Sequence, residues 1–244
     1  MPAERYFVED AFRVGETCEL KGSEFHHLAH VMRTRKGEEV ELVNGRGALA
    51  QAVVHQLGKD RAALTIQNVL QEEYVPACRI ILAQAMPKPN RLDFILEKGT
   101  ELGVDCFWLF PGNLSAKKEF FPHQLERARH LTIAAMKQCG RLILPAIELK
   151  PALEEWPVLD HLLPYFGDVS PDAPLFEETS DAIRSAGIPI LFFTGPESGF
   201  NMQETDVLRN LGAKGVKLHS NILRTDTASL VALSLISHWL PNRG

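Results

Sequence analysis

The chain has 244 residues, of which 45% are hydrophobic and 23% are charged, and its formal net charge is -5. This composition is typical of a soluble globular protein and excludes a disordered chain or a low-complexity fibre. No stretch reaches the roughly 18 uncharged apolar residues that a membrane-spanning helix needs. The first residues lack the basic start and apolar run of a secretory signal. We therefore expect a cytoplasmic protein that does not associate with membranes.

The four cysteines are far apart and include no Cys-x-x-Cys pair, so neither a disulfide framework nor a zinc ribbon is indicated. His26 and His30 have the helical spacing of two zinc ligands. No cysteine-rich or carboxylate-rich segment accompanies them. We expect no metal site, and interpret the histidines as a polar helix face or an RNA-facing surface.

The net charge hides local clusters of cations. Residues 151–180 contain no Lys or Arg and seven acidic residues. Because the chain as a whole is not basic, any contact with RNA must come from local groups of positive charge. These groups are 33–36 (Arg-Thr-Arg-Lys), Lys117 with Lys118, and Arg127 with Arg129.

The first seventy residues predict short strands and one helix. Ser23 is the expected N-cap of a helix over residues 24–32. Residues 44–47 (Asn-Gly-Arg-Gly) predict a hairpin turn. Strands are expected at residues 5–8, 40–43, 50–56 and 62–69. Short strands joined by tight turns favour a small barrel, and the sequence changes character near residues 72–76.

From residue 79 onward, strands alternate with helices. Asn90 and Asp93 are the expected caps of a helix that ends at Gly103. Other helices are expected at residues 125–139, 202–211 and 225–240, and strands at 80–83, 106–110, 173–176, 188–194 and 215–218. This alternation predicts an α/β domain with a parallel sheet and helices on both faces. The acidic, proline-rich residues 151–174 are expected to form a surface excursion.

The segment Leu191–Phe200 reads as an apolar strand followed by a Gly-rich turn. In α/β sheets, ligands bind where strands end, and glycines let backbone amides approach them. The order of residues matches neither a P-loop nor a nucleophile elbow, which makes Ser198 a weak candidate nucleophile. The alternative interpretation is a plain connection between a strand and a helix.

A second strand, at residues 215–218, leads to Arg224, Thr225, Asp226 and Thr227 at the start of a helix. Capping explains the hydroxyls and the carboxylate. It does not explain Arg224, because a cation at the positive end of a helix needs a compensating anion. That anion is either a carboxylate, a phosphate or an oxyanion that develops during a reaction.

These two loops, together with other motifs, resemble the SPOUT class of S-adenosylmethionine-dependent RNA methyltransferases, and within it the RsmE type. The matching motifs are His26-His27-Leu28 with Arg33, Lys98-Gly-Thr-Glu101-Leu102-Gly103-Val104, Gln138-Cys139-Gly140-Arg141, Gly195-Pro-Glu-Ser-Gly199-Phe200 and Ile222-Leu-Arg-Thr-Asp-Thr-Ala228. The chain departs from the family pattern at three positions. It has Ser198 where the family has Gly, Cys139 where it has Ser, and Asp226 where it has Glu.

The resemblance implies an N-terminal PUA-like barrel (residues 1–73) and a C-terminal SPOUT methyltransferase domain with a trefoil knot (residues 74–244). It implies that S-adenosylmethionine is the cofactor and N3 of a uridine in 16S ribosomal RNA, alone or in the small ribosomal subunit, is the methylated atom. The implied cofactor-binding residues are Phe176, Thr194, Gly195, Pro196, Glu197, Gly199, Leu218, Ser220, Ile222, Leu223 and Thr227. The implied RNA-binding residues are His27, Arg33, Arg35, Lys36, Gln138 and Arg141.

Because uridine N3 is protonated and neutral at pH 7, catalysis must favour its deprotonation and align it with the methyl group. Arg224 is the candidate that stabilises negative charge on the uracil oxygens. Glu197 or Asp226 either takes the proton or holds Arg224. Residues 225–240 are apolar nearly all round, which favours a homodimer. Two alternatives remain, a SPOUT enzyme that acts on tRNA and a non-enzymatic RNA-binding protein.

Overall fold

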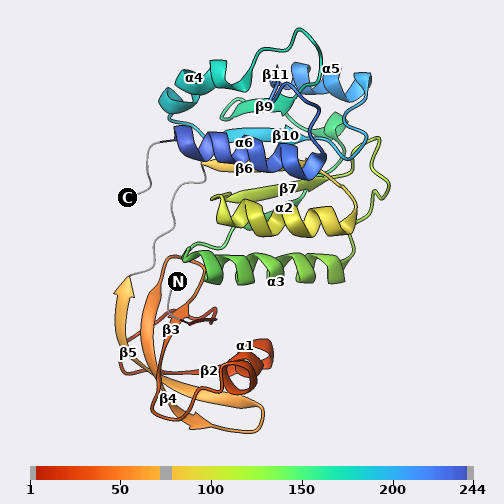
Figure 1. Ribbon diagram of the computed structural model, residues 1–244. Coiled ribbons are helices and arrows are strands. Elements are labelled where there is room, and N and C mark those ends of the chain that lie inside the picture. Colours follow the sequence, from red (N-terminus) through yellow and green to blue (C-terminus); the bar gives the residue numbers. More distant parts are fainter. Residues whose placement is uncertain (1–3, 72–78, 241–244) are drawn as a thin grey trace. The chain divides into compact units, whose positions relative to one another are not determined.

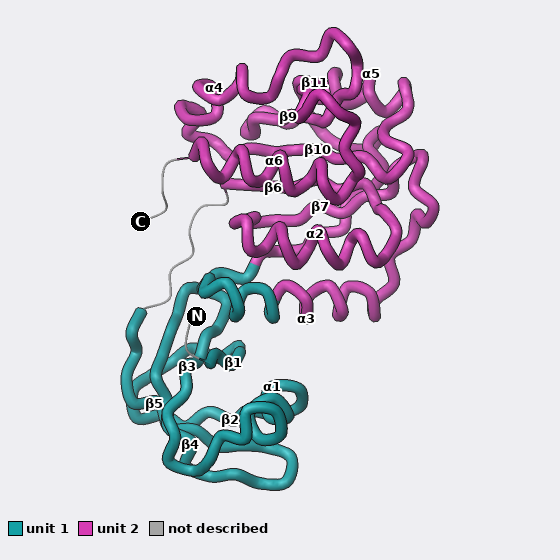
Figure 2. The backbone as a smooth tube through the Cα atoms, viewed as in Figure 1, with its two compact units in different colours: residues 1–76, 133–144 teal, residues 77–132, 145–244 magenta. Residues whose placement is uncertain are grey.

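The computed structural model describes residues 4–71 and 79–240. They form two compact units, shown in Figure 2. Unit 1 is Met1–Pro76 with Ile133–Leu144, and unit 2 is Ala77–Thr132 with Pro145–Gly244. The expected change near residues 72–76 lies outside the described residues. The structure adds residues 133–144 to the N-terminal unit, so α3 (Pro122–Cys139) begins in unit 2 and ends in unit 1.

Unit 1 is built on a five-stranded sheet in the order β1-β3-β4-β5-β2. Its strands are β1 (Arg5–Phe7), β2 (Thr17–Lys21), β3 (Glu39–Val43), β4 (Leu49–Leu57) and β5 (Arg61–Gln71). Only β1 and β3 are parallel. Alternate residues of β4 and β5 are buried, as a sheet with one face on a core requires. The small β domain expected from the sequence is confirmed, with β2 as an additional strand.

The expected hairpin forms between β3 and β4. Asn44 organises the turn, because its Oδ1 accepts hydrogen bonds from the backbone N–H groups of Arg46 and Ala48 at 2.9 and 3.1 Å. Residues 142–144 pair with the same turn: Gly47 N–H donates to the carbonyl of Leu142 at 3.0 Å. These backbone bonds explain why residues 133–144 belong to unit 1.

The expected helix over residues 24–32 is two shorter pieces, α1 (Gly22–His26) and a π-helical turn, η1 (His27–Val31). Ser23 is not its N-cap, because the helix starts two residues earlier than expected, at Gly22, and Lys21 occupies the N-cap position without a side-chain bond. The π-helical turn ends at Val31, and two residues later Arg33 has a φ of 56°, the one positive value among the non-glycine residues described.

Unit 2 contains a parallel six-stranded sheet in the order β11-β9-β10-β6-β7-β8. Its strands are β6 (Ile80–Ala85), β7 (Cys106–Phe110), β8 (Ala146–Leu149), β9 (Leu163–Gly167), β10 (Ile190–Thr194) and β11 (Lys214–Val216). Its helices, besides the start of α3, are α2 (Pro89–Glu101), η2 (Leu153–Glu155), η3 (Phe176–Thr179), α4 (Ser180–Ser185), α5 (Met202–Asn210) and α6 (Thr225–Trp239). The predicted α/β architecture is confirmed.

Helices cover both faces of this sheet. Ile80 and Leu82 on β6 point into a core shared with α2 and α6, which contact each other (Figure 1). Ile81 and Ala83 point into a second core with α5 and η2. This burial on both sides explains why β6 is a continuous apolar run rather than an alternating one. Within the described ranges, no helix has the length and apolar character needed to span a membrane.

Two expectations for the middle of unit 2 are wrong. Residues 151–174 do not form a surface excursion, because they contain β9, a buried strand between β10 and β11. The acidic flanks of β9 conceal its short apolar run. Residues 173–176 do not form a strand. Leu175 makes one isolated bridge with Lys217, and Phe176 then begins η3.

The expected cap of α2 is also wrong. Lys88 is the N-cap, without a side-chain bond, and Pro89 is the first helical residue. Proline suits this position because its missing N–H would have no partner within the helix. Asp93 instead binds Arg127 on α3, at 2.7 Å.

Candidate functional site

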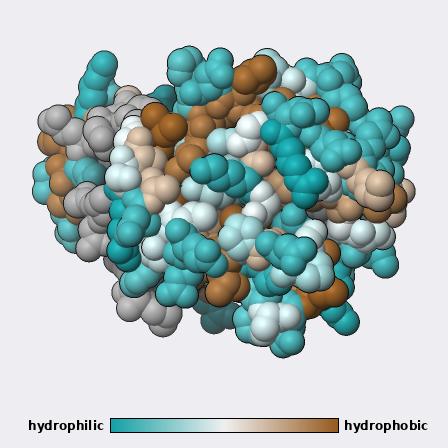
Figure 3. Space-filling model, turned by 90° about the horizontal axis from the view of Figure 1, so that it is seen from above, coloured by the Kyte–Doolittle hydropathy of each residue, from teal (hydrophilic) through white to brown (hydrophobic). Residues whose placement is uncertain are grey.

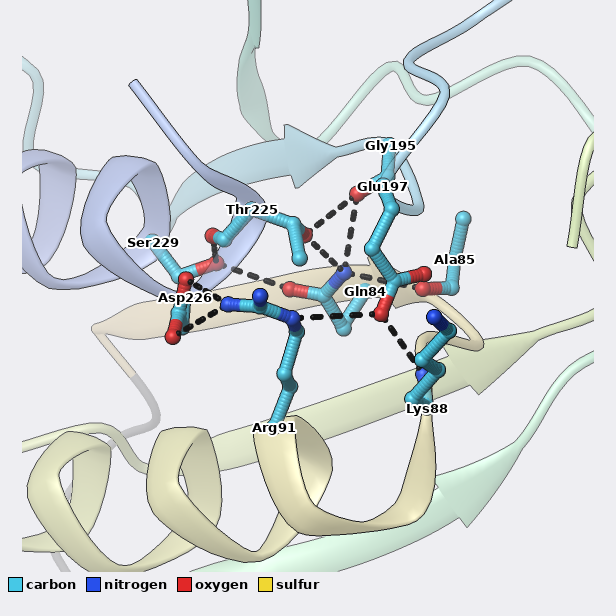
Figure 4. A network of polar contacts seen from close by, with 9 residues as sticks. All are labelled: Gln84, Ala85, Lys88, Arg91, Gly195, Glu197, Thr225, Asp226 and Ser229. Atoms are coloured by element: carbon cyan, nitrogen blue, oxygen red, sulfur yellow. Dashed lines mark hydrogen bonds and ion pairs between the residues drawn. The ribbon is translucent and has the colours of Figure 1, made fainter.

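The candidate site lies where the strand order of the parallel sheet reverses. From β6 the chain adds β7 and β8 on one side, whereas β10, β9 and β11 lie on the other. The carboxyl ends of β6 and β10 are therefore neighbours at a topological switch point, the usual place for a ligand in such sheets. The loop after β10 and the segment before α6 meet there, as Figure 4 shows.

Gln84, near the end of β6, contacts both the loop after β10 and the start of α6. Its side chain is fully buried. Its Nε2 donates to the carbonyl oxygens of Ala85 and Gly195, at 2.8 and 3.1 Å, and to Thr225 Oγ1 at 3.1 Å. Its Oε1 accepts from Ser229 Oγ at 2.7 Å. Since a buried amide without partners is costly, this network fixes the start of α6 against the ends of β6 and β10.

The loop after β10 is so tight that Gly195 has no room for a side chain. A Cβ at this position would lie 2.8 Å from the carbonyl carbon of Gly199. Gly199 has a φ of 71°, a value that favours glycine. Its N–H donates to the carbonyl of Pro196 at 2.9 Å. The two glycines therefore allow a tight turn in which the backbone of Gly195 packs on that of Gly199; the approach of a ligand to this backbone stays a prediction.

Arg91, in the first turn of α2, binds both candidate carboxylates. Its Nη1 donates to the two carboxylate oxygens of Asp226 at 2.8 and 2.7 Å. Its Nε lies 3.4 Å from Glu197 Oε1, which also accepts the backbone N–H of Lys88 at 3.0 Å. Figure 4 shows this side chain rising from α2 between the two acids. Three segments are joined by one guanidinium group.

The prediction that Asp226 or Glu197 pairs with Arg224 is wrong, because Arg91 occupies both. Arg224 is the N-cap residue of α6, its side chain is exposed, and it has no ion pair within the described ranges. No side chain caps α6. Thr225 instead donates its hydroxyl to the carbonyl of Gly195, at 2.6 Å. Among the described residues, no carboxylate compensates the charge of Arg224, which is exposed to solvent.

Apart from Phe176, the candidate cofactor-binding residues form two groups. One runs from Thr194, the last residue of β10, to Gly199, and the other lies within residues 218–227 after β11, at the same edge of the sheet. Within the second group Ile222 is 82% exposed, although it is a large apolar residue. Phe176 is different: its ring is 1% exposed and packs on Trp239 with 5.1 Å between ring centroids. Its side chain belongs to the core, and its role toward a cofactor stays a prediction.

The six RNA-binding candidates all belong to unit 1. Arg33, Arg35, Lys36 and Gln138 are exposed, and His27 and Arg141 are half-buried. His27 Nε2 lies 3.2 Å from a carboxylate oxygen of Glu4. Within the described ranges, no three His, Cys, Asp or Glu side chains gather closely enough to hold a metal ion.

Arg33 occupies a strained position. The N–H of Thr34 donates to the carbonyl of Leu28 at 3.0 Å, so Arg33 lies at the left-handed turn that ends the helix. Glycine is the usual residue there. This backbone outlier makes Arg33 a candidate for a functional role.

Sequence reasoning missed Gln84 and Arg91. Both had a signal in the sequence. Gln84 is a polar residue within an otherwise apolar buried strand, and Arg91 is a cation in the first turn of a helix, the same anomaly that singled out Arg224.

Comparisons with known proteins agree with this geometry. The profile of a family described as an RNA methyltransferase domain matches residues 74–237, and that of an RNA methyltransferase PUA domain matches residues 20–67. The chain therefore belongs to the RNA methyltransferase family, which confirms the resemblance found in the sequence.

Three relatives illustrate the similarity. Ribosomal RNA small subunit methyltransferase E of Mycobacterium bovis is 30% identical, and the match covers 98% of this chain and 94% of the relative. The protein of the same name from Bacillus subtilis is 27% identical, with 96% of each chain covered. The crystal structure of ribosomal RNA small subunit methyltransferase E from Neisseria gonorrhoeae, bound to S-adenosyl methionine, is 27% identical. Its TM-score is 0.85, and the match covers 98% of each chain.

Proposed function

We propose that this protein methylates N3 of a uridine in the 16S ribosomal RNA of the small ribosomal subunit and uses S-adenosylmethionine as the methyl donor. The observation that carries the proposal is the meeting of the 195–199 loop and the 221–227 segment at the switch point, where Arg224 is exposed without an ion-pair partner in the described ranges. The names and the bound ligand of the relatives support the substrate and the cofactor.

The residues present fit the cofactor. Thr194 Oγ1 is buried and has no hydrogen-bond partner within the described ranges, although it lies directly before the loop. The backbone of Gly199 fills the space beside Gly195, whereas nothing lies within 4 Å of the Cβ position of Gly199, so open space adjoins the loop there. Thr194, Gly195 and residues 218–223 would hold the cofactor, whose sulfonium supplies an electrophilic methyl group.

The protein's own part in the reaction is to orient the uracil and to stabilise the charge on its oxygens when N3 loses its proton. An exposed guanidinium at Arg224 suits this task, because it can donate two parallel hydrogen bonds. Asp226 does not hold Arg224. Both its oxygens accept bonds from Arg91, and each keeps a further lone pair that can accept the proton from N3.

RNA binding is proposed for the six candidates in unit 1, among which Arg33 has the strongest support because of its strained backbone. The substrate implies a cytoplasmic location. The trefoil knot of the C-terminal domain stays a prediction from the resemblance.

A homodimer through the C-terminal domain is also proposed. Leu230, Val231 and Leu235 on α6 are only half-buried by their own chain, which leaves part of this helix face open to a second subunit. Figure 3 shows one face of the molecule, on which hydrophobic and hydrophilic residues are mixed. Light scattering at micromolar concentration tests this proposal, and a monomer would contradict it.

The decisive experiment compares modified nucleosides in ribosomal RNA from cells with and without the gene. We expect one N3-methyluridine in 16S ribosomal RNA to disappear and to return when purified small subunits are incubated with the protein and S-adenosylmethionine. Methylation of tRNA in place of ribosomal RNA would support the first alternative. Cofactor binding without any methylated RNA would contradict the proposal.

A further inference from the structure

Two carboxylates and one cation link the three segments that make up the candidate site. Arg91 comes from the start of α2, Glu197 from the loop after β10, and Asp226 from the first turn of α6 (Figure 4). The exposed fractions of these side chains are 21%, 28% and 20%. Because they are partly shielded from water, their interaction is screened less than that of a fully exposed pair.

The location of Arg91 requires an explanation of its own. A cation in the first turn of α2 is opposed by the positive end of the helix. Glu197 compensates for this, since its Oε1 accepts the N–H of the N-cap residue Lys88 at 3.0 Å and lies 3.4 Å from Arg91 Nε. Asp226 is favourably placed in the first turn of α6. The two acids together make the position of Arg91 favourable.

We propose that Arg91 is a positioning residue for methyl transfer, which fixes the 195–199 loop and the start of α6 relative to each other and thereby sets the place of Arg224. Gln84 holds the buried side of the same two segments through Gly195 and Thr225. Arg91 holds their outer side. Arg224 is two residues from Asp226, so a shift of Asp226 moves Arg224 as well.

This inference rests on the proposed function for its rate measurement. The methylation rate should depend on the ion pair between Arg91 and Asp226, because a displacement of a reacting group by about 1 Å can slow a reaction by on the order of a hundredfold. In single-turnover methylation at saturating cofactor and RNA, we expect Arg91→Ala to be slower by on the order of ten- to a hundredfold. Arg91→Lys should recover part of the rate, since an ammonium reaches one acid but lacks the guanidinium fork.

A double-mutant cycle separates positioning from an independent role. If Arg91 acts through Asp226, the variant with both Arg91→Ala and Asp226→Asn should be no slower than the slower single variant. Arg184→Ala is the matched control. It removes an exposed arginine that pairs with Asp181 in α4, and it should keep the parental rate. A parental rate in Arg91→Ala, or losses that multiply in the double variant, would overturn the inference.

Hydrogen exchange in the protein without cofactor or RNA gives a readout that needs no activity. Arg91→Ala should speed amide exchange in residues 195–201 and 221–228, and it should leave β4 and β5 unchanged. Unchanged exchange in both loops would overturn the inference. If the parent protein methylates no RNA, the proposed function fails, and this measurement still decides the role of Arg91.

Discussion

Gln84→Glu should destabilise unit 2 although it changes the volume of the side chain very little. Nε2 of Gln84 donates to the carbonyls of Ala85 and Gly195 at 2.8 and 3.1 Å. An ionised carboxylate is only an acceptor, so the substitution places an oxygen against these two oxygens in a site with no exposed surface.

The size of the effect follows from the groups that lose a donor. A buried polar group without its partner costs about 1–3 kcal/mol. The amide has two hydrogens, and its shortest carbonyl contacts, to Ala85 and Gly195, carry most of the effect, whereas the contact to the carbonyl of Thr194 is longer, at 3.4 Å. Gly195 keeps the hydroxyl bond from Thr225 at 2.6 Å, which limits its share. We expect a loss of about 2–4 kcal/mol, or a fall in melting temperature of about 4–16 °C in a domain of this size.

The assay is thermal unfolding followed by circular dichroism at pH 5 and pH 8. Burial raises the pKa of the introduced carboxyl in the folded state above the unfolded value of about 4.3. The folded state of the variant therefore becomes less stable as the pH rises above about 4.3, and its loss of stability relative to the parent should be larger at pH 8 than at pH 5. Gln67→Glu, at an exposed position on β5, is the matched control and should change little. A parental melting temperature at pH 8, or a penalty that does not grow with pH, would refute the reasoning.

Four further predictions concern single residues. Arg224→Ala should slow single-turnover methylation by on the order of a hundred- to a thousandfold. The melting temperature should change little, because the side chain is exposed. An unchanged methylation rate would exclude a catalytic role. Arg33→Ala and Arg33→Gly should both weaken RNA binding, and the slope of log affinity against log salt concentration should become shallower by about one; RNA titrations at several salt concentrations test this. The glycine variant should also have a higher melting temperature than the parent, since a φ of 56° favours glycine. Burial raises the pKa of the Cys18 thiol to about 11, so urea unfolding should show stability falling from pH 9 to pH 11, and the fall should shrink in Cys18→Ala. Trp239→Glu should unfold unit 2, because Trp239 is 7% exposed and packs on Phe176; a folded monomer of this variant would instead place Trp239 at the dimer interface.

The sequence by itself determined the class of each unit. The alternation of apolar residues predicted β4 and β5, and the apolar runs with helical stripes between them predicted the α/β unit, because these patterns reflect local geometry and burial. The limits of local patterns appear at β9. Its short apolar run has acidic neighbours, and only pairing with β10 and β11 makes it a strand.

The sequence also located the two loops of the candidate site, since glycines and an unexplained arginine mark them locally. Only the tertiary structure decided which cation meets which acid. Arg91 and Asp226 are 135 positions apart, and no local pattern connects them. Parallel strands bring the loops after β6 and β10 to one edge regardless of sequence distance, which places Arg91 near Glu197. Helix α6 follows β11 and packs against α2, which places Asp226 beside Arg91, whereas Arg224 is exposed.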